Sequence, residues 1–168
     1  MMQQVENILT LKSKWLNIYC DKWKDGAQIF DYWRVEKLDS IIILPVFENE
    51  FILPKKQYRV GIDAFTLDFP GGRRLHKNLV DSVKEILIRE LEISEKNING
   101  IVAIGNKKFI VNSSFNSQCV FYYVAHLNDI VNLKHYIRYN INDNTLQDDL
   151  ECLQCAFGLL LYKGQKHG

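Results

Sequence analysis

The densest group of basic side chains lies directly after two glycines near the middle of the chain. Gly71 and Gly72 are followed by Arg73, Arg74, His76 and Lys77, and Arg59 lies upstream. Planar guanidinium groups match the geometry of phosphate oxygens, so this group is a candidate phosphate-binding site. A solvated basic loop is the alternative, because runs of charge commonly face water.

Cys152 and Cys155 form a Cys-x-x-Cys pair, a spacing that suits a metal or redox site. Apolar residues continue around the pair at helical spacing, among them Leu153, Phe157 and Leu160. This pattern favours core or half-buried cysteines over a functional pair. A zinc site would need two more converging ligands.

Two hairpins are predicted in the first third of the chain. Residues 15–20 and 27–35 are aromatic and β-branched, and the Asp25-Gly26 pair between them is a turn signal. The continuous apolar run 40–46 resumes at 51–53 after an acidic turn, which predicts a second hairpin with a central first strand.

One helix is predicted after the basic group. Asp81 begins it, the side chains of Val83, Leu87 and Leu91 form a core-facing stripe at a spacing of four, and it should end near Glu95.

The remaining elements complete a mixed pattern. Further strands are expected over residues 66–69, 101–104, 109–111 and 119–127. A closing helix is expected over residues 145–162, capped by Asp143 or Asn144 and ended by Gly164. Strands, a helix, more strands and a closing helix predict an α+β fold, with a mixed β-sheet and flanking helices, over a doubly wound one.

Bulk composition predicts one ordinary domain. The 168 residues, 47% apolar and 24% charged, suffice for one core, so residues 1–168 are expected to form a single domain with an N-terminal hairpin segment, 1–36, and a core, 37–168. The net charge of +1 offers no overall field for nucleic acid or an anionic membrane. Because the chain has no long apolar run and four scattered cysteines, we expect a cytoplasmic protein that binds neither nucleic acid nor a membrane.

The glycine pair and the helix after it resemble a known motif. A strand ending in Asp68-Phe69-Pro70-Gly71-Gly72, a basic loop and a helix with Arg89-Glu90-Leu91 together resemble the Nudix hydrolase box. Upstream, KKQYR at 55–59 and TLDFPGG at 66–72 are similar to the ADP-ribose pyrophosphatase branch, which also begins with an N-terminal β-hairpin. The resemblance covers nearly the whole chain and implies a Nudix-type α/β/α sandwich.

The resemblance implies a metal site that this chain has largely lost. Such a box binds Mg²⁺ or Mn²⁺ through helix carboxylates, and Glu90 would be the metal ligand and catalytic residue. The two further carboxylates of the family would fall at Ile93 and Ser94, neither of which is acidic. Glu92, like Glu85 and Glu95, lies roughly 140° to 160° from Glu90 on a continuous helix, on the opposite face. The box is therefore degenerate.

Other box positions also depart from the family. Asp81 falls where the leading Glu belongs, but the loop before it is longer than usual, so Asp81 is expected to cap the helix and pair with Arg89. In the loop before the strand at 119–127, where the similar branch carries a catalytic Glu, this chain has Ser117 and Gln118, and Gln cannot act as a base.

The resemblance, together with these residues, implies recognition of a nucleoside diphosphate derivative similar to ADP-ribose. Arg59, Arg73 and Arg74, with Gly71 and Gly72, would hold phosphate. Hydrolysis would be weakened or lost, and the cofactor would be Mg²⁺ or Mn²⁺ if the protein is active and none otherwise.

Two alternatives remain open: an active Mg²⁺- or Mn²⁺-dependent hydrolase of nucleoside diphosphate sugars, and a protein-interaction domain with a vestigial cleft. The resemblance also implies a homodimer through the N-terminal strands. Aromatic residues concentrate there, at Trp15, Tyr19, Trp23, Tyr32 and Trp33. They could stack on a base, but packing against the sheet or across a dimer interface is favoured.

Overall fold

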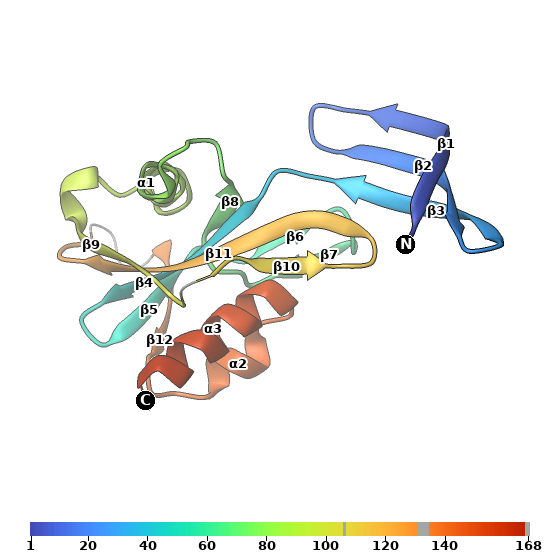
Figure 1. Cartoon of the computed structure of the whole chain (residues 1–168). Coiled ribbons are helices and arrows are strands. Elements are labelled where there is room, and N and C mark those ends of the chain that lie inside the picture. The colour runs from blue at the N-terminus through green and yellow to red at the C-terminus, as the bar shows by residue number, and fades with distance from the viewer. Residues whose placement is uncertain (106, 131–134, 167–168) are drawn as a thin grey trace. The chain divides into compact units, whose positions relative to one another are not determined.

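A computed structural model describes residues 1–105, 107–130 and 135–166. Its contacts divide the chain into two compact units (Figure 1). The first unit comprises Met1–Asp39 and Phe109–Val120, and the second comprises Ser40–Lys108 and Phe121–Gly168. Strand β11 (Asn116–Leu127) supplies its first residues to one unit and the rest to the other. The expectation of a single domain over residues 1–168 stays a prediction.

Three antiparallel strands form most of the first unit. They are β1 (Gln3–Lys12), β2 (Asn17–Asp25) and β3 (Gln28–Glu36). The predicted hairpin is confirmed as β2 and β3, whose turn places Gly26 at φ 58°, in the left-handed region that glycine tolerates. The sequence pattern missed β1, because this strand is exposed along its whole length and so has no alternation of buried and exposed positions.

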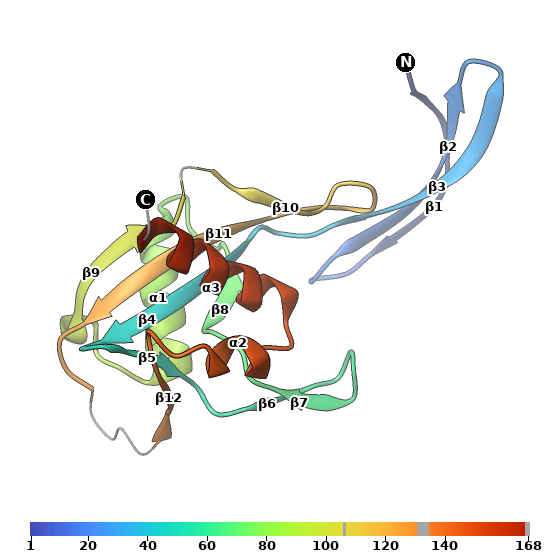
Figure 2. The same ribbon diagram turned by 90° about the horizontal axis from the view of Figure 1, so that it is seen from below.

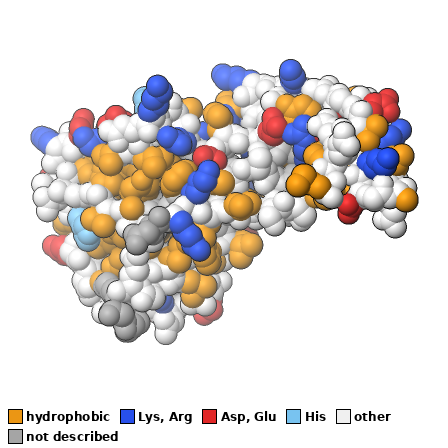
Figure 3. Space-filling model, in the orientation of Figure 1, with side chains coloured by type: hydrophobic (Ala, Val, Ile, Leu, Met, Phe, Trp, Pro, Cys, Tyr) orange, Lys and Arg blue, Asp and Glu red, His pale blue; other side chains and the backbone are white. Residues whose placement is uncertain are grey.

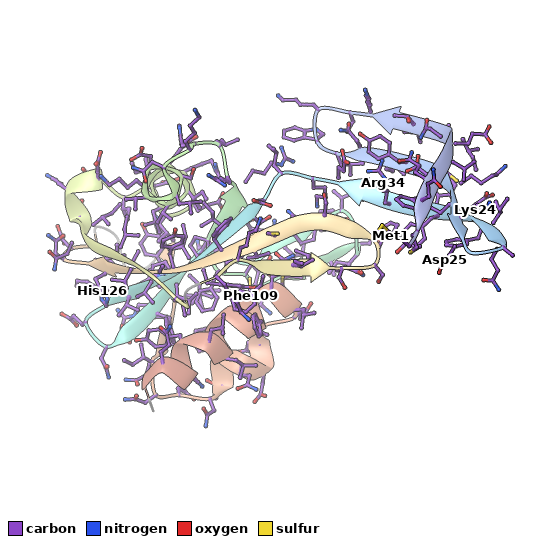
Figure 4. The ribbon with its side chains drawn as sticks, viewed as in Figure 1. Met1, Lys24, Asp25, Arg34, Phe109 and His126 are labelled. Atoms are coloured by element: carbon purple, nitrogen blue, oxygen red, sulfur yellow. The ribbon has the colours of Figure 1, made fainter. Side chains whose placement is uncertain are left out.

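A buried carboxylate joins these three strands. Asp21 on β2 is fully buried and accepts hydrogen bonds from Asn7 on β1 at 2.7 Å, Gln4 on β1 at 2.9 Å and Arg34 on β3 at 2.8 Å. Figure 4 labels Arg34 on β3. The Asn7 bond, with help from Arg34 and Gln4, holds the pKa of Asp21 below its usual range despite desolvation. The same unit contains β10 (Phe109–Asn112), which pairs antiparallel with β11.

The sheet of the second unit is built around β4 (Ser40–Phe47). It pairs antiparallel with β5 (Glu50–Leu53) and β8 (Gly71–Arg73), and it neighbours β11. Outer strands are β12 (Ile137–Asn140), which pairs with β5, and β9 (Ile98–Ala103), which pairs with β11. A separate short hairpin joins β6 (Gln57–Arg59) to β7 (Ala64–Thr66). The second predicted hairpin and the central position of its first strand are confirmed.

Helices cover both faces of this sheet. Helix α1 (Leu79–Leu91) lies on one face, and α2 (Thr145–Asp149) and α3 (Leu153–Lys166) lie on the other (Figures 1 and 2). The predicted stripe of α1, Val83, Leu87 and Leu91, is fully buried against β4 residues such as Ile41. Strand β4 is accordingly buried on both faces, as its continuous apolar run requires. The predicted mixed sheet with flanking helices is confirmed.

The limits of α1 differ from the prediction. Asn78, and not Asp81, is its N-cap, and its side chain accepts a hydrogen bond from the Val80 N–H at 3.1 Å. The helix ends at Leu91 because Glu92 takes a left-handed conformation, φ 50°. A short 3₁₀ helix, η1 (Glu95–Asn97), follows. The expected end near Glu95 is therefore wrong, because the spacing of apolar residues does not indicate where the backbone takes a left-handed conformation.

Three other predicted boundaries are also wrong. The strand expected over 66–69 ends at Thr66, and Gly71 and Gly72, expected at the end of that strand, lie in a separate strand, β8, which pairs with β4. Ser117 and Gln118 lie in β11 instead of the loop before it.

The closing helix is split into α2 and α3, and α3 runs through Gly164. Extended backbone at Leu150 makes the break, while its buried side chain keeps the apolar pattern that suggested one helix. Of the two proposed caps, the Asp143 side chain accepts from the Thr145 N–H at 2.9 Å. No helix in the described part of the chain is long and apolar enough to span a membrane.

Candidate functional site

The second unit contains a cavity of about 480 Å³ beside the glycine pair. The residues around it come from β4 and β8, from the β6–β7 hairpin and the segments on either side of it, from the end of α1, and from the start of α3 and the residues just before it. They are Ile42, Pro54, Lys55, Gln57, Arg59, Gly61, Ile62, Thr66, Asp68, Phe69, Gly71, Glu90, Glu151, Cys152 and Cys155. The volume falls within the range of small-molecule sites, and apolar walls with a few polar groups are typical of them.

Glu90 reaches the cavity from the last turn of α1. Its carboxylate is 20% exposed and accepts hydrogen bonds from Gln57 Nε2 at 3.2 Å and from the neighbouring Arg89 Nε at 3.0 Å. Gln57 belongs to the QYR element, which the family resemblance pointed out without giving this side chain a role. Glu90 is thus a positioned anion at the cavity wall.

Arg59 lines the cavity and is held by Asp68. Its Nε and Nη2 donate to Asp68 Oδ2 at 2.9 and 2.5 Å, and Thr66 Oγ1 donates to the same oxygen at 2.8 Å. Using Nε and Nη2 on one carboxylate oxygen leaves Nη1 to donate to a ligand. Asp68 therefore orients a cation toward the cavity.

The two glycines allow close packing around this site. A Cβ at Gly71 would lie 2.9 Å from Ile42 Cδ1 and 3.2 Å from the Ile41 carbonyl oxygen. A Cβ at Gly72 would lie 3.0 Å from Arg89 Nη2 and 3.1 Å from Ile86 Cγ1. Their role here is to let β8 approach β4 and α1, and the Gly71 carbonyl accepts from Arg89 Nη2 at 3.4 Å. Arg89 and Glu90 are positioned by that approach.

The rest of the predicted basic group lies elsewhere. Arg74 donates to the backbone carbonyls of His76 and Lys77, and His76 pairs with Glu85 at 2.7 Å. Neither Arg73 nor Arg74 is among the residues that line the cavity. Of the predicted ligand residues, the structure brings Arg59, Gly71 and Glu90 to one cavity, and Gly72, Arg73 and Arg74 contribute nothing to its described walls.

Two predictions about acidic residues of α1 need correction. Asp81 is exposed in the first turn, and the ion-pair partner of Arg89 is Glu90. Glu92 does not lie on the face opposite Glu90, because the helix has ended: Glu90 and Glu92 line the same smaller cavity of about 260 Å³, together with Lys55 and His135. Ile93 is buried in the core, where the sequence already excluded it as a ligand.

Glu85 and Glu95 point away from this region, as expected. Glu85 pairs with His76, and Glu95 pairs with Lys84 at 2.6 Å; all four side chains are more than a third exposed. Of the three acidic residues expected on the face opposite Glu90, only Glu92 lies on the same side as Glu90 instead.

The cysteine pair lies at the cavity wall, at the first turn of α3. Cys155 is buried with its Sγ 3.7 Å from Asp68 Oδ1, and Cys152 is half-buried directly before the first helical residue. A hydrogen bond from the Cys155 thiol, together with backbone N–H groups of Cys155 and Gln154, lowers the pKa of Cys152 to about 6 against the opposing effect of desolvation. Its hydrogen bond to Cys152 and its burial raise the pKa of Cys155.

Comparison with solved structures finds a close match in fold. A crystal structure described as an ADP compounds hydrolase matches 98% of this chain and 91% of its own, with a TM-score of 0.67 and 18% sequence identity. The chain has a Nudix-like fold. The sequence matches no family model and no curated protein.

In this Nudix-like fold, the donors around Glu90 do not fit a metal site made of several carboxylates. The one group of three or more His, Cys, Asp or Glu ligand atoms that converges in residues 1–105, 107–130 and 135–166 is Asp68, Cys152 and Cys155. Glu90 is engaged by Arg89 and Gln57, and Mg²⁺ or Mn²⁺ prefers a site with several oxygens. The degeneracy of the box and the loss of hydrolysis stay predictions.

Sequence reasoning assigned no role to Gln57 or Asp68 and treated the cysteine pair as packing. The signals were present as the KKQYR element, the TLDFPGG element and the Cys-x-x-Cys spacing. Nothing in the sequence, however, indicates that residues 68 and 155, so far apart in the chain, come into contact.

Proposed function

We propose that the protein binds a nucleoside diphosphate derivative similar to ADP-ribose in the cavity of the second unit and that hydrolysis of the diphosphate bond is weakened or lost. One observation carries the proposal: the cavity combines two cationic side chains, Lys55 and Arg59, with a carboxylate, Glu90, that belongs to no group of converging metal ligands in the described chain. The fold shared with an ADP compounds hydrolase supports the ligand class.

Arg59 is the expected phosphate contact. Asp68 holds its guanidinium through Nε and Nη2, so the side chain is already ordered and loses little conformational freedom on binding. Lys55 adds a second charge at the same wall. Apolar wall residues such as Ile62 and Phe69 suit the uncharged parts of the ligand.

Isothermal titration with ADP-ribose and related nucleoside diphosphate sugars, with and without Mg²⁺ or Mn²⁺, tests this proposal. Arg59→Gln should weaken binding roughly 10- to 100-fold, because it removes a charged hydrogen-bond donor. Arg138→Gln is the matched control, since Arg138 also pairs with a carboxylate, that of Glu50 at 3.0 Å, but does not line the cavity. Equal affinities in both variants, or no binding to the whole panel, would overturn the proposal.

The active hydrolase is the second candidate, and the cavity shared by Glu90 and Glu92 favours it. It would require Mg²⁺ or Mn²⁺ together with phosphate oxygens of the substrate as ligands. Product analysis by chromatography separates the two functions. Metal-dependent turnover that disappears in Glu90→Gln would establish the hydrolase and refute weakened catalysis.

A homodimer through the N-terminal unit is part of the same proposal. Ile29 and Trp33 on β3 are 59% and 48% exposed, and Val5 on β1 is 54% exposed. Figure 3 shows hydrophobic side chains among charged ones on the surface of this unit. Large exposed apolar side chains are common in interfaces. Sedimentation of the wild type and of Trp33→Lys would test this, with a dimer expected only for the wild type.

The interaction-domain alternative uses the same surface with a different partner. It predicts that the nucleotide panel gives no binding while Trp33→Lys still abolishes association with that partner.

A further inference from the structure

Three potential metal-ligating side chains converge in the wall of the cavity, apart from Glu90. A carboxylate oxygen of Asp68 and the sulfurs of Cys152 and Cys155 all lie within 4.8 Å of one another. They come from the segment between β7 and β8 and from the start of α3, so two elements far apart in sequence build the cluster. Two sulfurs and one oxygen form a donor set that favours a thiophilic cation over Mg²⁺ or Mn²⁺.

We propose that Asp68, Cys152 and Cys155 form a binding site for a thiophilic divalent cation of the Zn²⁺ class. This site is distinct from a carboxylate-bound metal at Glu90, and its occupation requires no nucleotide.

The spacing of the donors suits a tetrahedral ion. Cys155 Sγ lies 3.7 Å from Asp68 Oδ1. In tetrahedral zinc, Zn–S and Zn–O lengths of about 2.3 and 2.0 Å separate a sulfur from an oxygen ligand by about 3.5 Å. The pair therefore needs only a small movement to share one ion.

Asp68 is oriented for this role by contacts on its other oxygen. Arg59 and Thr66 both donate to Oδ2, while Oδ1 faces the Cys155 thiol. Carboxylates that bind metals are typically held in place by hydrogen bonds of this kind from neighbouring residues. The Asp68 side chain is 12% exposed, so its position is also limited by packing.

The start of α3 supplies the two sulfurs. Cys152 precedes the first helical residue, Leu153, and Cys155 lies in the first turn, so both thiols are at the positive end of the helix. The helix N-terminus favours the thiolate form, which binds metals, at Cys152, whereas the buried Cys155 becomes a thiolate only when the ion displaces its proton. Ligation by both sulfurs releases the protons that they carry as thiols.

The fourth coordination position would face the cavity. All three donors line it, and so does the exposed carboxylate of Glu151. Three protein ligands with a fourth position for water or a ligand oxygen are the arrangement of zinc sites that act on bound molecules. The Cys-x-x-Cys pair thus has a role beyond packing.

Metal titration of the reduced full-length chain tests the site. After removal of metal, Zn²⁺ is titrated in competition with a chromophoric chelator, and Co²⁺ is used as a spectroscopic probe. One equivalent should bind, with a sulfur-to-cobalt charge-transfer band in the near ultraviolet. Cys152→Ser and Cys155→Ser should abolish the band. Asp68→Asn should weaken binding by at least roughly 10- to 100-fold, the loss typical for residues that only hydrogen-bond to metal ligands.

Matched variants separate this site from the cysteines of the first unit and from Glu90. Cys119→Ser removes a buried cysteine of the first unit and should bind Zn²⁺ like the wild type. Glu90→Gln should also bind normally, so loss of nucleotide binding and loss of metal binding remain distinguishable. Circular dichroism verifies that each variant folds.

Two results would overturn the proposal. The first is that the reduced wild-type protein binds no Zn²⁺ and produces no cobalt band. This result would also hold if the cysteine pair served only to cycle between dithiol and disulfide. The second is unchanged Zn²⁺ affinity in folded Cys152→Ser and Cys155→Ser, which would place the ion elsewhere.

Discussion

The close approach at Gly71 can be tested by adding one methyl group. In Gly71→Ala, the new Cβ would lie 2.9 Å from Ile42 Cδ1 and 3.2 Å from the carbonyl oxygen of Ile41. Ile42 Cδ1 is the end of a flexible side chain that lines the cavity and can turn into it, whereas the Ile41 carbonyl belongs to the central strand β4 and cannot move by itself. The backbone contact at Ile41 therefore resists the extra atom, and Ile42 must leave its rotamer to admit it.

The expected cost is that of overpacking, about 1–3 kcal/mol in the free energy of unfolding. For a chain of this size, each kcal/mol lowers the melting temperature by roughly 2–4 °C. Differential scanning calorimetry and urea unfolding measure the change. Because Gly71 also lines the cavity, nucleotide titration of the same variant should show weaker binding.

Gly100→Ala is the matched control. Gly100 also lies in a strand, β9, but a Cβ added there meets nothing within 4 Å. Its stability should be unchanged or slightly increased, because alanine restricts the unfolded chain. If Gly71→Ala is as stable as Gly100→Ala, the pair Gly71 and Gly72 does not serve close packing, and its role must lie in contact with the ligand.

Three further predictions concern single side chains. The lowered pKa of Asp21 stabilises the fold at pH values above 3.8, the ordinary pKa of this carboxyl, and the stabilisation should decline as the pH falls below 3.8. Asp21→Asn should be less stable than the wild type at neutral pH, and its stability should depend less on acid. Urea unfolding from pH 7 to pH 3 measures both effects. Reaction of metal-free, reduced protein with iodoacetamide should depend on Cys152 with a midpoint near its pKa of about 6, where an unperturbed thiol at 9.0 would barely react, and Cys152→Ser should remove this phase. Asn78→Ala should lower stability by about 1 kcal/mol through loss of the helix cap, while Asp81→Ala should change it less, and a reversed order in chemical unfolding would contradict the cap seen in the structure.

Much of the fold could be predicted because its signals are local. The apolar run over 40–46 indicated a central strand, and the spacing of Val83, Leu87 and Leu91 indicated the buried face of α1. Both patterns reflect which side chains must leave water, and burial of these residues follows directly. The glycine pair and the Arg-Glu-Leu helix likewise indicated the Nudix-like fold, which the solved structure of an ADP compounds hydrolase shares.

Element boundaries were less predictable for a physical reason. The end of α1 depends on one left-handed residue, Glu92, and the break after α2 depends on extended backbone at Leu150. Neither residue type marks such a conformation, because packing of the surrounding segment selects it. The helical-wheel argument about Glu92 failed with the boundary on which it rested.

The sequence alone determined the composition of the candidate site: one carboxylate, Glu90, after an arginine on the helix, and apolar or neutral residues at 93 and 94 where the family has acids. Only the tertiary structure decided which side chains meet. It placed Arg59 at the cavity and Arg74 on its own loop, and it brought Asp68 to Cys155 across 87 positions of sequence. Side-chain chemistry is carried by each residue, whereas contact between distant residues is set by how the strands and helices pack.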